Sequence, residues 1–225
     1  MKIIDLSMTI QPGMYMPKSH WHPQVEFTVM GTHAKEGRMT RKIQVGTHTG
    51  THMDASLHFL PKGDTIDNVP LDKVVGPAQL VDVSFVEPRH AITPDDLKKG
   101  IRGSRGNKDT IVESRVVIRT GWVEKAYGKD SFGKDKPYFI KETVRWLLDQ
   151  GVNFLLTDTP DPDSEEDFVF GKAAPIHVLL FENGITLVEN IANADQLPEF
   201  FTIIALPLKL EGCDGAPARI IAMVE

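Results

Sequence analysis

The sequence contains a single cysteine, Cys213, among its 225 residues. One thiol excludes an internal disulfide framework and is typical of a reducing compartment. No apolar stretch approaches the ~20 residues that a membrane-spanning helix needs. The first residues, MKIIDLSMTIQPG, lack the continuous apolar segment of a secretory signal. We therefore expect a cytoplasmic protein that does not bind membranes.

Positive charge is also in short supply, with 25 Lys and Arg residues against 31 Asp and Glu residues and a net charge of −6. A protein that binds nucleic acid by electrostatic attraction shows a basic surface, so this class is disfavoured. The sequence has no internal repeat, low-complexity tract or Ser/Gly linker. We therefore expect one domain over residues 1–225 that does not bind nucleic acid.

Strand signals outnumber helix signals. Apolar alternation or β-branched runs predict strands at residues 3–7, 24–30, 41–45, 78–83, 115–120, 152–157, 185–189, 201–206 and 218–224. An N-cap Thr93, followed by proline and two acids, predicts a helix that ends at Gly100. Apolar residues at helical spacing predict helices at 139–150 and 175–182. Because strands and helices are interspersed, the sequence indicates an α/β fold in which few helices flank a mixed β-sheet.

The histidines are concentrated in one place, since three of the eight lie within eleven consecutive residues. His48, His52, Asp54 and His58 all occupy even positions, which share one face of an extended chain. Ten fully extended residues span ~33 Å, however, which is too far for one coordination sphere. A helix is disfavoured by the Thr-Gly-Thr content of the segment. We therefore expect the chain to bend at Gly50, where no Cβ hinders a turn.

Imidazoles with a carboxylate are the ligands expected for Zn²⁺ and similar divalent ions. A structural zinc site usually includes thiolates, and this segment has none. Nitrogen and oxygen ligands with open positions are typical of a catalytic metal. Two alternatives stay open, namely loop histidines that bind no metal and a metal-binding protein without turnover.

The same residues carry a family resemblance. The segment His48-x-Gly50-Thr51-His52-x-Asp54-x-x-x-His58 resembles the H-x-G-T-H-x-D-x-P-x-H signature of the cyclase family of metal-dependent hydrolases, which includes bacterial kynurenine formamidases and isatin hydrolases. Comparable stretches occur at residues 119–122, 157–163, 177–190 and 215–219. Two departures are Ser56, where the signature has proline, and Asp161, where many members have serine. Both affect the pocket more than the metal.

The resemblance implies a swivelling β/β/α-type fold and a set of metal ligands. His48, His52 and Asp54 would hold one ion, and Asp54 would bridge to a second ion held by His177 and Glu189. The predicted helix–turn–strand unit independently favours the last pair, because it brings both residues to one edge. The resemblance further implies Zn²⁺, or alternatively Mn²⁺, with one or two ions per chain, and a homodimer or homotetramer.

The resemblance also implies hydrolysis of a small amide by a metal-activated water, as in an arylformamidase. Cyclic amides of the isatin type and lactones are the alternative substrates. His58 would act beside the metal as an acid/base or as an additional ligand. Trp21 is expected to stack on a flat substrate or to cover the edge of the core. Ser56 and Asp158 are further candidates for substrate contact.

Overall fold

A closed β-barrel forms the centre of the computed structural model, which describes residues 1–103, 105, 109–166 and 174–225. Within this part of the chain, seven strands follow one another around the barrel in the order β12-β11-β5-β7-β9-β10-β4, and β4 pairs with β12 to close it. They are β4 (His52–Asp54), β5 (Val75–Asp82), β7 (Arg115–Arg119), β9 (Phe154–Thr157), β10 (Thr186–Glu189), β11 (Phe200–Pro207) and β12 (Gly215–Val224).

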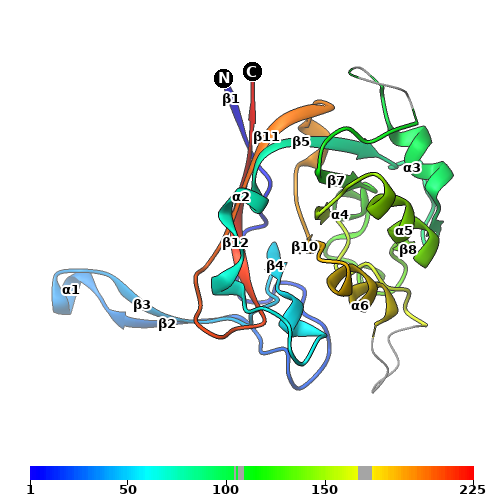
Figure 1. Ribbon diagram of the computed structural model, residues 1–225. Coiled ribbons are helices and arrows are strands. Elements are labelled where there is room, and N and C mark those ends of the chain that lie inside the picture. Colours follow the sequence, from blue (N-terminus) through cyan, green and yellow to red (C-terminus); the bar gives the residue numbers. More distant parts are fainter. Residues whose placement is uncertain (104, 106–108, 167–173) are drawn as a thin grey trace.

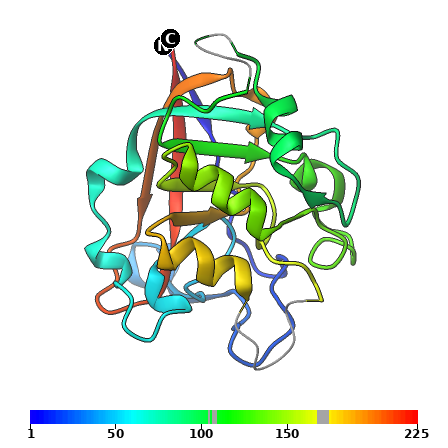
Figure 2. The same cartoon turned by 45° about the vertical axis from the view of Figure 1, so that its right-hand side comes forward.

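The sheet is mixed, as the sequence predicts. Strands β5, β7, β9 and β10 run parallel, and β4, β11 and β12 pair with their neighbours in antiparallel fashion. An additional strand, β1 (Lys2–Asp5), pairs with the end of β12, so the two termini lie side by side (Figures 1 and 2). The α/β expectation is confirmed.

Successive residues of the barrel strands pack on opposite sides, because side chains alternate across a strand. The interior is filled by one parity, which includes Met53, Leu80, Val117, Leu156, Val188 and Ile220. The other parity packs against helices and includes Val81, Ile118, Leu155 and Leu187. The covering helices are α3 (Pro94–Gly100), α5 (Lys141–Asp149) and α6 (Pro175–Glu182), which lie across the outside of the parallel strands (Figure 2).

The predicted strands and helices are confirmed, with bounds that shift by a few residues. Helix α5 begins at Lys141, because Phe139 belongs to a short strand. The sequence gives no separate signal for β4, which has three residues. The remaining elements are α1 (His33–Glu36), α2 (Leu71–Val74), α4 (Trp122–Ala126), β6 (Ala91–Ile92), β8 (Tyr138–Phe139) and the 3₁₀ turns Ser56–His58, Ile66–Asn68 and Ala194–Gln196. None of the helices in the described part of the chain is both long and apolar enough to cross a membrane.

Two of the predicted strands form an arm outside the barrel. Strands β2 (Glu26–Gly31) and β3 (Thr40–Gln44) pair only with each other among the described residues and form an antiparallel hairpin. The hairpin carries α1 at its tip and projects away from the body of the protein (Figure 1).

The N-terminus of α3 offers a stability prediction. The Asp96 N–H donates to the Thr93 hydroxyl (3.2 Å), and Asp96 Oδ2 accepts from the Thr93 N–H (2.9 Å) and pairs with His90 Nε2 (2.8 Å). We expect Asp96→Ala to lower the free energy of unfolding by ~1–2 kcal/mol at pH 7. Urea unfolding measures this loss, and Asp95→Ala, at an exposed position of the same turn, is the matched control with ~0.5 kcal/mol or less.

The loss is expected to depend on pH. Burial opposes ionisation of Asp96, but the hydrogen bonds from His90 and Thr93 outweigh it and lower the pKa of this carboxyl from 3.8. An acid with a lowered pKa stabilises the fold above its usual pKa and loses this contribution as the pH falls through the lowered value. The difference between wild type and Asp96→Ala should therefore shrink below pH 3.8. Equal costs for both variants at pH 7 would contradict the capping role.

Candidate functional site

Two changes of chain direction bring the histidine-rich segment together. Gly50 adopts a left-handed conformation (φ +61°), and the chain turns there before entering β4. After Asp54, the chain turns again through the 3₁₀ segment that ends at His58. The bend expected at Gly50 is confirmed, and the second turn explains how residues ten apart reach one site.

The pairing of β4 with β10 sets the centre of the site. His52 lies opposite Glu189 in the ladder, and Asp54 lies opposite Leu187. Met53, between them, faces the barrel interior, so His52 and Asp54 point to the outer side, where α6 packs. His52 Nε2 lies 3.3 Å from Asp54 Oδ1 and 3.3 Å from Glu189 Oε2.

Helix α6 supplies the fourth group, His177. Its Nε2 lies 3.1 Å from Glu189 Oε1 and 3.6 Å from Asp54 Oδ2, as the helix–turn–strand prediction required. Its Nδ1 donates to Asp163 Oδ2 (2.6 Å). The Asp163 carboxylate also accepts the N–H groups of Ile176 (2.7 Å) and His177 (3.2 Å), which satisfies the helix end. Asp163 therefore fixes both the helix and the imidazole ring.

His48 and His58 meet at a carboxylate that the sequence analysis missed. Asp214 Oδ2 lies 2.8 Å from His48 Nε2 and 2.9 Å from His58 Nδ1. His48 Nδ1 lies 2.8 Å from Asp54 Oδ1. The next residue, Gly215, has no room for a Cβ, which would lie 2.8 Å from His48 Cε1. Asp214 directly precedes the stretch 215–219, which resembles the family.

The site offers two groups of metal-binding atoms that share Asp54. Within the described residues, the donor atoms of His48, Asp54 and His58 lie within 4.8 Å of one another, and so do those of His52, Asp54 and Glu189. The family resemblance implies a different grouping, with His48 beside His52 and Glu189 beside His177. Among the described residues, buried Asp54 Oδ2 has no hydrogen-bond partner, which is a state that a bound cation would relieve. The imidazole and carboxylate set fits a divalent metal.

The neighbouring imidazoles keep the shared carboxylate, Asp54, in the ionised form that binds a cation. Burial alone would raise the pKa of Asp54, but His48, His177 and His52 hold it well below its usual value. Burial would likewise lower the pKa of His177, yet its contacts with Asp163, Asp54 and Glu189 raise it. Asp54 is therefore ionised at neutral pH, as a metal ligand must be.

A cavity of about 900 Å³ opens over these groups, within the usual size range of ligand sites. Its aromatic lining consists of Tyr15, Trp21, Phe59, Tyr127 and Phe132. Trp21 lies at the rim with 51% of its surface exposed, which is compatible with the stacking role expected from the sequence.

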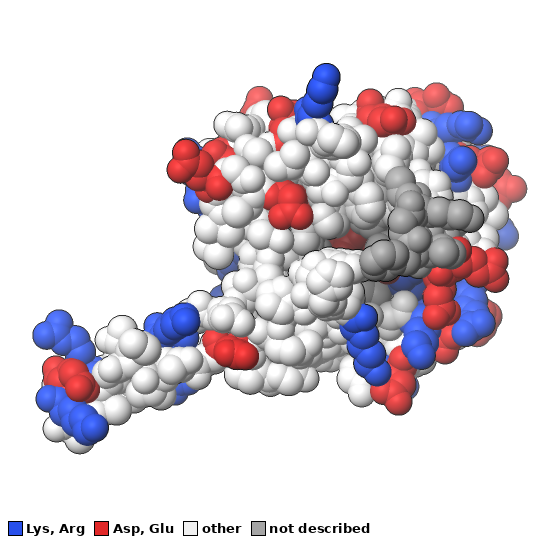
Figure 3. All heavy atoms as spheres, turned by 90° about the horizontal axis from the view of Figure 1, so that it is seen from below, with Lys and Arg blue, Asp and Glu red and all other residues white. Residues whose placement is uncertain are grey.

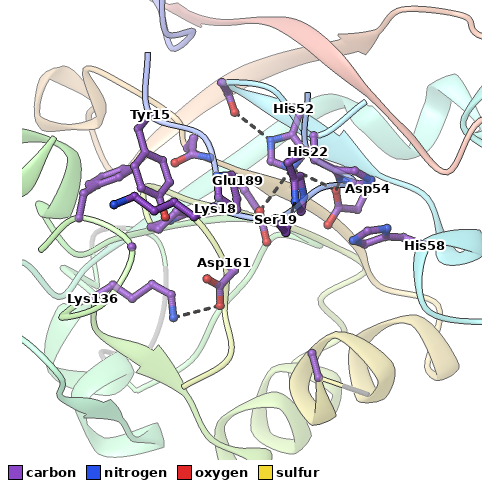
Figure 4. Close-up of a pocket in the computed structure, with 18 of the residues that line it drawn as sticks. Tyr15, Lys18, Ser19, His22, His52, Asp54, His58, Lys136, Asp161 and Glu189 are labelled. Carbon is purple, nitrogen blue, oxygen red and sulfur yellow. Dashed lines mark hydrogen bonds and ion pairs between the residues drawn. The ribbon is translucent and has the colours of Figure 1, made fainter. Parts of the chain in front are cut away.

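Lys136 and Asp161 form a second group of polar side chains, across the cavity from His58 (Figure 4). Lys136 Nζ lies 3.0 Å from Asp161 Oδ1 and donates to the Asp163 carbonyl. Burial raises the pKa of Asp161 to about 6. Burial also raises the pKa of Tyr15 to about 12, and the negative charges of Asp161 and Glu189 add to this shift. Tyr15 thus remains a hydroxyl donor at neutral pH.

Ser56 and Asp158 lie outside the cavity lining. The Ser56 hydroxyl accepts the Asp64 N–H (2.8 Å) within a local turn. The buried Asp158 carboxylate accepts the N–H groups of Thr120 (2.8 Å) and Trp122 (2.9 Å) and so holds the turn after β7. The geometry gives both residues structural roles in place of the substrate contacts expected from the sequence.

Asp163 provides a test of the imidazole support. Asp163→Asn removes the charged acceptor of His177 Nδ1, and we expect a ~10- to 100-fold loss of metal affinity. Isothermal titration of the metal-free protein with Zn²⁺ measures this loss. Asp161→Asn removes the same charge from the same loop and should change the affinity less than tenfold, because the partner of Asp161 is Lys136 (3.0 Å) rather than His177. Equal losses in both variants would assign the effect to general charge.

Comparison with known proteins gives a consistent result. Residues 4–164 match the family described as cyclase. The chain is 30% identical over 224 residues to a kynurenine formamidase of Salinibacter ruber, which covers 98% of this chain and 97% of that protein. It is 31% identical to a kynurenine formamidase of Bacillus thuringiensis over 182 residues, which covers 80% of this chain and 78% of that protein.

Solved structures show the same fold. Isatin hydrolase A from Labrenzia aggregata, bound to benzyl benzoate, superposes with a TM-score of 0.83 at 26% identity, over 99% of this chain and 93% of that one. A structure described as a potential metal-dependent hydrolase with cyclase activity superposes with a TM-score of 0.76 at 27% identity, over 98% and 96% of the two chains.

Proposed function

The chain belongs to the cyclase family, and from this premise we propose that it is a metal-dependent hydrolase that cleaves the C–N bond of a small aryl amide, as a kynurenine formamidase does. One observation carries the proposal: imidazoles and carboxylates of the described residues converge on Asp54, whose buried Oδ2 accepts no hydrogen bond from them, at the base of an open cavity. A closed coordination site would instead favour metal storage or sensing.

Different residues of the site bind the metal and transfer the proton. His48, His52, Asp54, Glu189 and His177 are the proposed metal ligands. These side chains would hold a divalent ion, which would make a nucleophilic water available near neutral pH and would polarise the scissile carbonyl. His58 borders the cavity, and its Nδ1 is engaged by Asp214, which leaves Nε2 to exchange a proton. We assign His58 the transfer of a proton to the departing amine, since an imidazole is suited to this near neutral pH.

The aromatic lining supports an aryl substrate. Phe132 packs edge-on against Tyr15 (ring centroids 5.0 Å apart) and Tyr127 (5.3 Å), which makes a firm apolar wall. A flat aromatic ring gains contact area on such a wall and on the exposed indole of Trp21. The wall also keeps water from the apolar part of the substrate.

A second candidate activity is hydrolysis of a cyclic amide of the isatin type. It is supported by the superposition on isatin hydrolase A. Both candidates break an amide C–N bond with the same groups, so they differ in which ring or chain the cavity accepts.

We also propose which metal binds, how many ions each chain holds and where in the cell the protein lies. Zn²⁺ suits the imidazole and carboxylate ligands, with Mn²⁺ as the alternative, and two ligand groups that share Asp54 accommodate one or two ions. A cytoplasmic location is supported by the single, half-buried Cys213.

The test is turnover by metal-quantified protein, prepared metal-free and then loaded with Zn²⁺ or Mn²⁺. Substrates are an N-formyl aniline, an isatin-type lactam and a simple lactone. We expect metal-dependent formate release from the N-formyl aniline at a higher kcat/KM than lactam opening. Faster lactam opening would favour the second candidate, and no metal-dependent hydrolysis of any substrate would refute the enzyme assignment.

A further inference from the structure

Lys136 differs from the other basic residues because it is buried. The Lys and Arg side chains visible in Figure 3 stand on the surface, whereas Lys136 has 3% of its surface exposed and is the one Lys or Arg that is buried in the described part of the chain. An ammonium group is costly to bury unless it is paired and hydrogen-bonded. Lys136 Nζ lies 3.0 Å from Asp161 Oδ1 and donates to the Asp163 carbonyl, so these contacts fix the Asp161 carboxylate in place.

The protein engages only one of the two oxygens of Asp161. Oδ1 lies against Lys136 Nζ and also accepts the Asp163 N–H (3.0 Å), whereas no described residue donates a hydrogen bond to Oδ2. The Asp161 side chain lines the cavity and is 21% exposed there, beside Lys136 (Figure 4). Oδ2 is therefore available to a molecule that enters the cavity.

The charge state of Asp161 indicates which chemical group Oδ2 can bind. Burial raises the pKa of Asp161 to about 6, and the ammonium group of Lys136 opposes this shift, so the carboxyl is ionised at neutral pH. An ionised carboxylate can only accept hydrogen bonds, and those that it accepts are stronger than bonds between neutral groups. Because Lys136 balances the charge of Asp161, the pair suits an uncharged donor, such as an aromatic amine, better than an ion.

Asp161 lies near both the aromatic wall and the metal site. Burial raises the pKa of Tyr15, and the charges of Asp161 and Glu189 add to this shift, so both carboxylates act on the same phenol. The Tyr15 ring packs on Phe132, and its hydroxyl lies against Gly133, where a Cβ would be 1.8 Å away. A flat ring that rests on this wall with its amide at the metal site therefore has its edge in the part of the cavity that Asp161 lines.

We propose that Asp161 determines specificity: its Oδ2 accepts a hydrogen bond from an uncharged donor on the aromatic ring of the substrate, and Lys136 holds the carboxylate for this contact. The proposal names the substrate class more closely and rests on the hydrolase function proposed above. Asp161 stands where many members of the family have serine. A serine hydroxyl would not balance a buried ammonium group, so Asp161 and Lys136 form one unit that distinguishes the cavity of this chain.

The test compares kcat/KM for N-formyl anilines that carry either an amino or a methyl group at the same ring position, with the ortho, meta and para positions tested in turn. The two groups are similar in size, and an aromatic amine is uncharged at neutral pH. At the ring position that reaches Asp161, the amino-to-methyl ratio should fall by ~10-fold or more from wild type to the double variant Lys136→Met/Asp161→Ser. Comparison between proteins cancels the intrinsic reactivity of the compounds, and removal of both charges leaves no unpaired buried ion.

Two single variants sharpen the test. Glu165→Gln removes an acid from the same cavity lining whose partner is Arg89 (3.9 Å), and it should keep the wild-type ratio. Asp161→Asn should reverse the preference. Its amide oxygen stays with Lys136 and the Asp163 N–H, which turns the NH₂ group to the cavity, so an acetyl substituent, which accepts, should be favoured over an amino substituent. A residue that only holds the loop would not produce this reversal.

An amino-to-methyl ratio that stays unchanged in the double variant at all three positions, or that falls equally in Glu165→Gln, would overturn the proposal. Circular dichroism and metal content verify that each variant is folded and loaded. Isothermal titration with the corresponding amino- and methyl-substituted anilines measures the same preference without turnover. A binding preference that the double variant loses, in a protein that hydrolyses none of the amides, would refute the hydrolase function and support the Asp161 contact. Hydrolysis without any preference would refute the contact alone.

Discussion

Asp54→Asn should leave the protein folded but unable to retain metal, with hydrolysis reduced by ~10³-fold or more, since loss of the ion removes several kcal/mol of transition-state stabilisation. This expectation follows from the position of Asp54 between the two groups of metal-binding atoms. Asp54 belongs to both groups of metal-binding atoms found among the described residues, so its loss affects each of them. An amide in its place keeps the shape but lacks the negative charge that the neighbouring imidazoles stabilise. Metal content by plasma mass spectrometry and kcat/KM are the two measurements.

The control for Asp54→Asn is Asp161→Asn, which removes a carboxylate from the same cavity outside both ligand groups. It should retain the wild-type metal content. If Asp54→Asn binds metal as wild type does, the proposed centre is wrong. If it loses metal yet hydrolyses normally, the metal has no part in the reaction.

His58→Ala should lower kcat by ~10²- to 10⁴-fold, the usual contribution of a positioned acid or base. His58 is held by Asp214 at the edge of the cavity and is one-quarter exposed, so it has access to both substrate and solvent. Metal bound by His52, Asp54 and Glu189 should remain, because that group does not include His58. Steady-state kinetics on metal-quantified protein measures the loss.

Addition of free imidazole distinguishes proton transfer from a structural effect. It should restore part of the activity of His58→Ala, because a small base can occupy the vacated space. His20→Ala removes another imidazole that lines the cavity but lies outside the ligand groups, and it should keep kcat within a few-fold of wild type. Full turnover by metal-loaded His58→Ala would exclude His58 from the reaction.

The sequence predicted the fold class and most of the elements because these depend on local patterns. The apolar runs at 115–120 and 152–157 are buried on both sides in the barrel, and such runs are recognisable without knowledge of their neighbours. Strand β4 was missed because three residues are too few to show a period. Barrel closure was missed for the same reason, since it depends on the pairing of β4 with β12.

The site was predicted where it is compact in sequence and missed where it is not. Spacing alone identifies the candidate ligands His48, His52, Asp54 and His58. The bend at Gly50 follows because ten extended residues are too long for one coordination sphere. Asp214 reaches His58 across 156 positions, a contact that no local pattern contains. Asp158 illustrates a different limit of sequence patterns. Its position within a family motif indicates substrate contact, whereas in the structure its carboxylate accepts the N–H groups of Thr120 and Trp122 within a turn.

The shortness of β4 has a thermodynamic consequence. Three residues join β10 to β12 and complete the barrel, so few backbone hydrogen bonds hold this seam, and we expect it to open more readily than the longer pairings of β11 with β5 and β12. His52 and Asp54 lie on one side of the seam and Glu189 lies on the other, so a cation held by all three residues would tie the two strands together. The free energy of metal binding would then add to the stability of the closed barrel. The concentration of the metal ion would therefore set how often the seam opens.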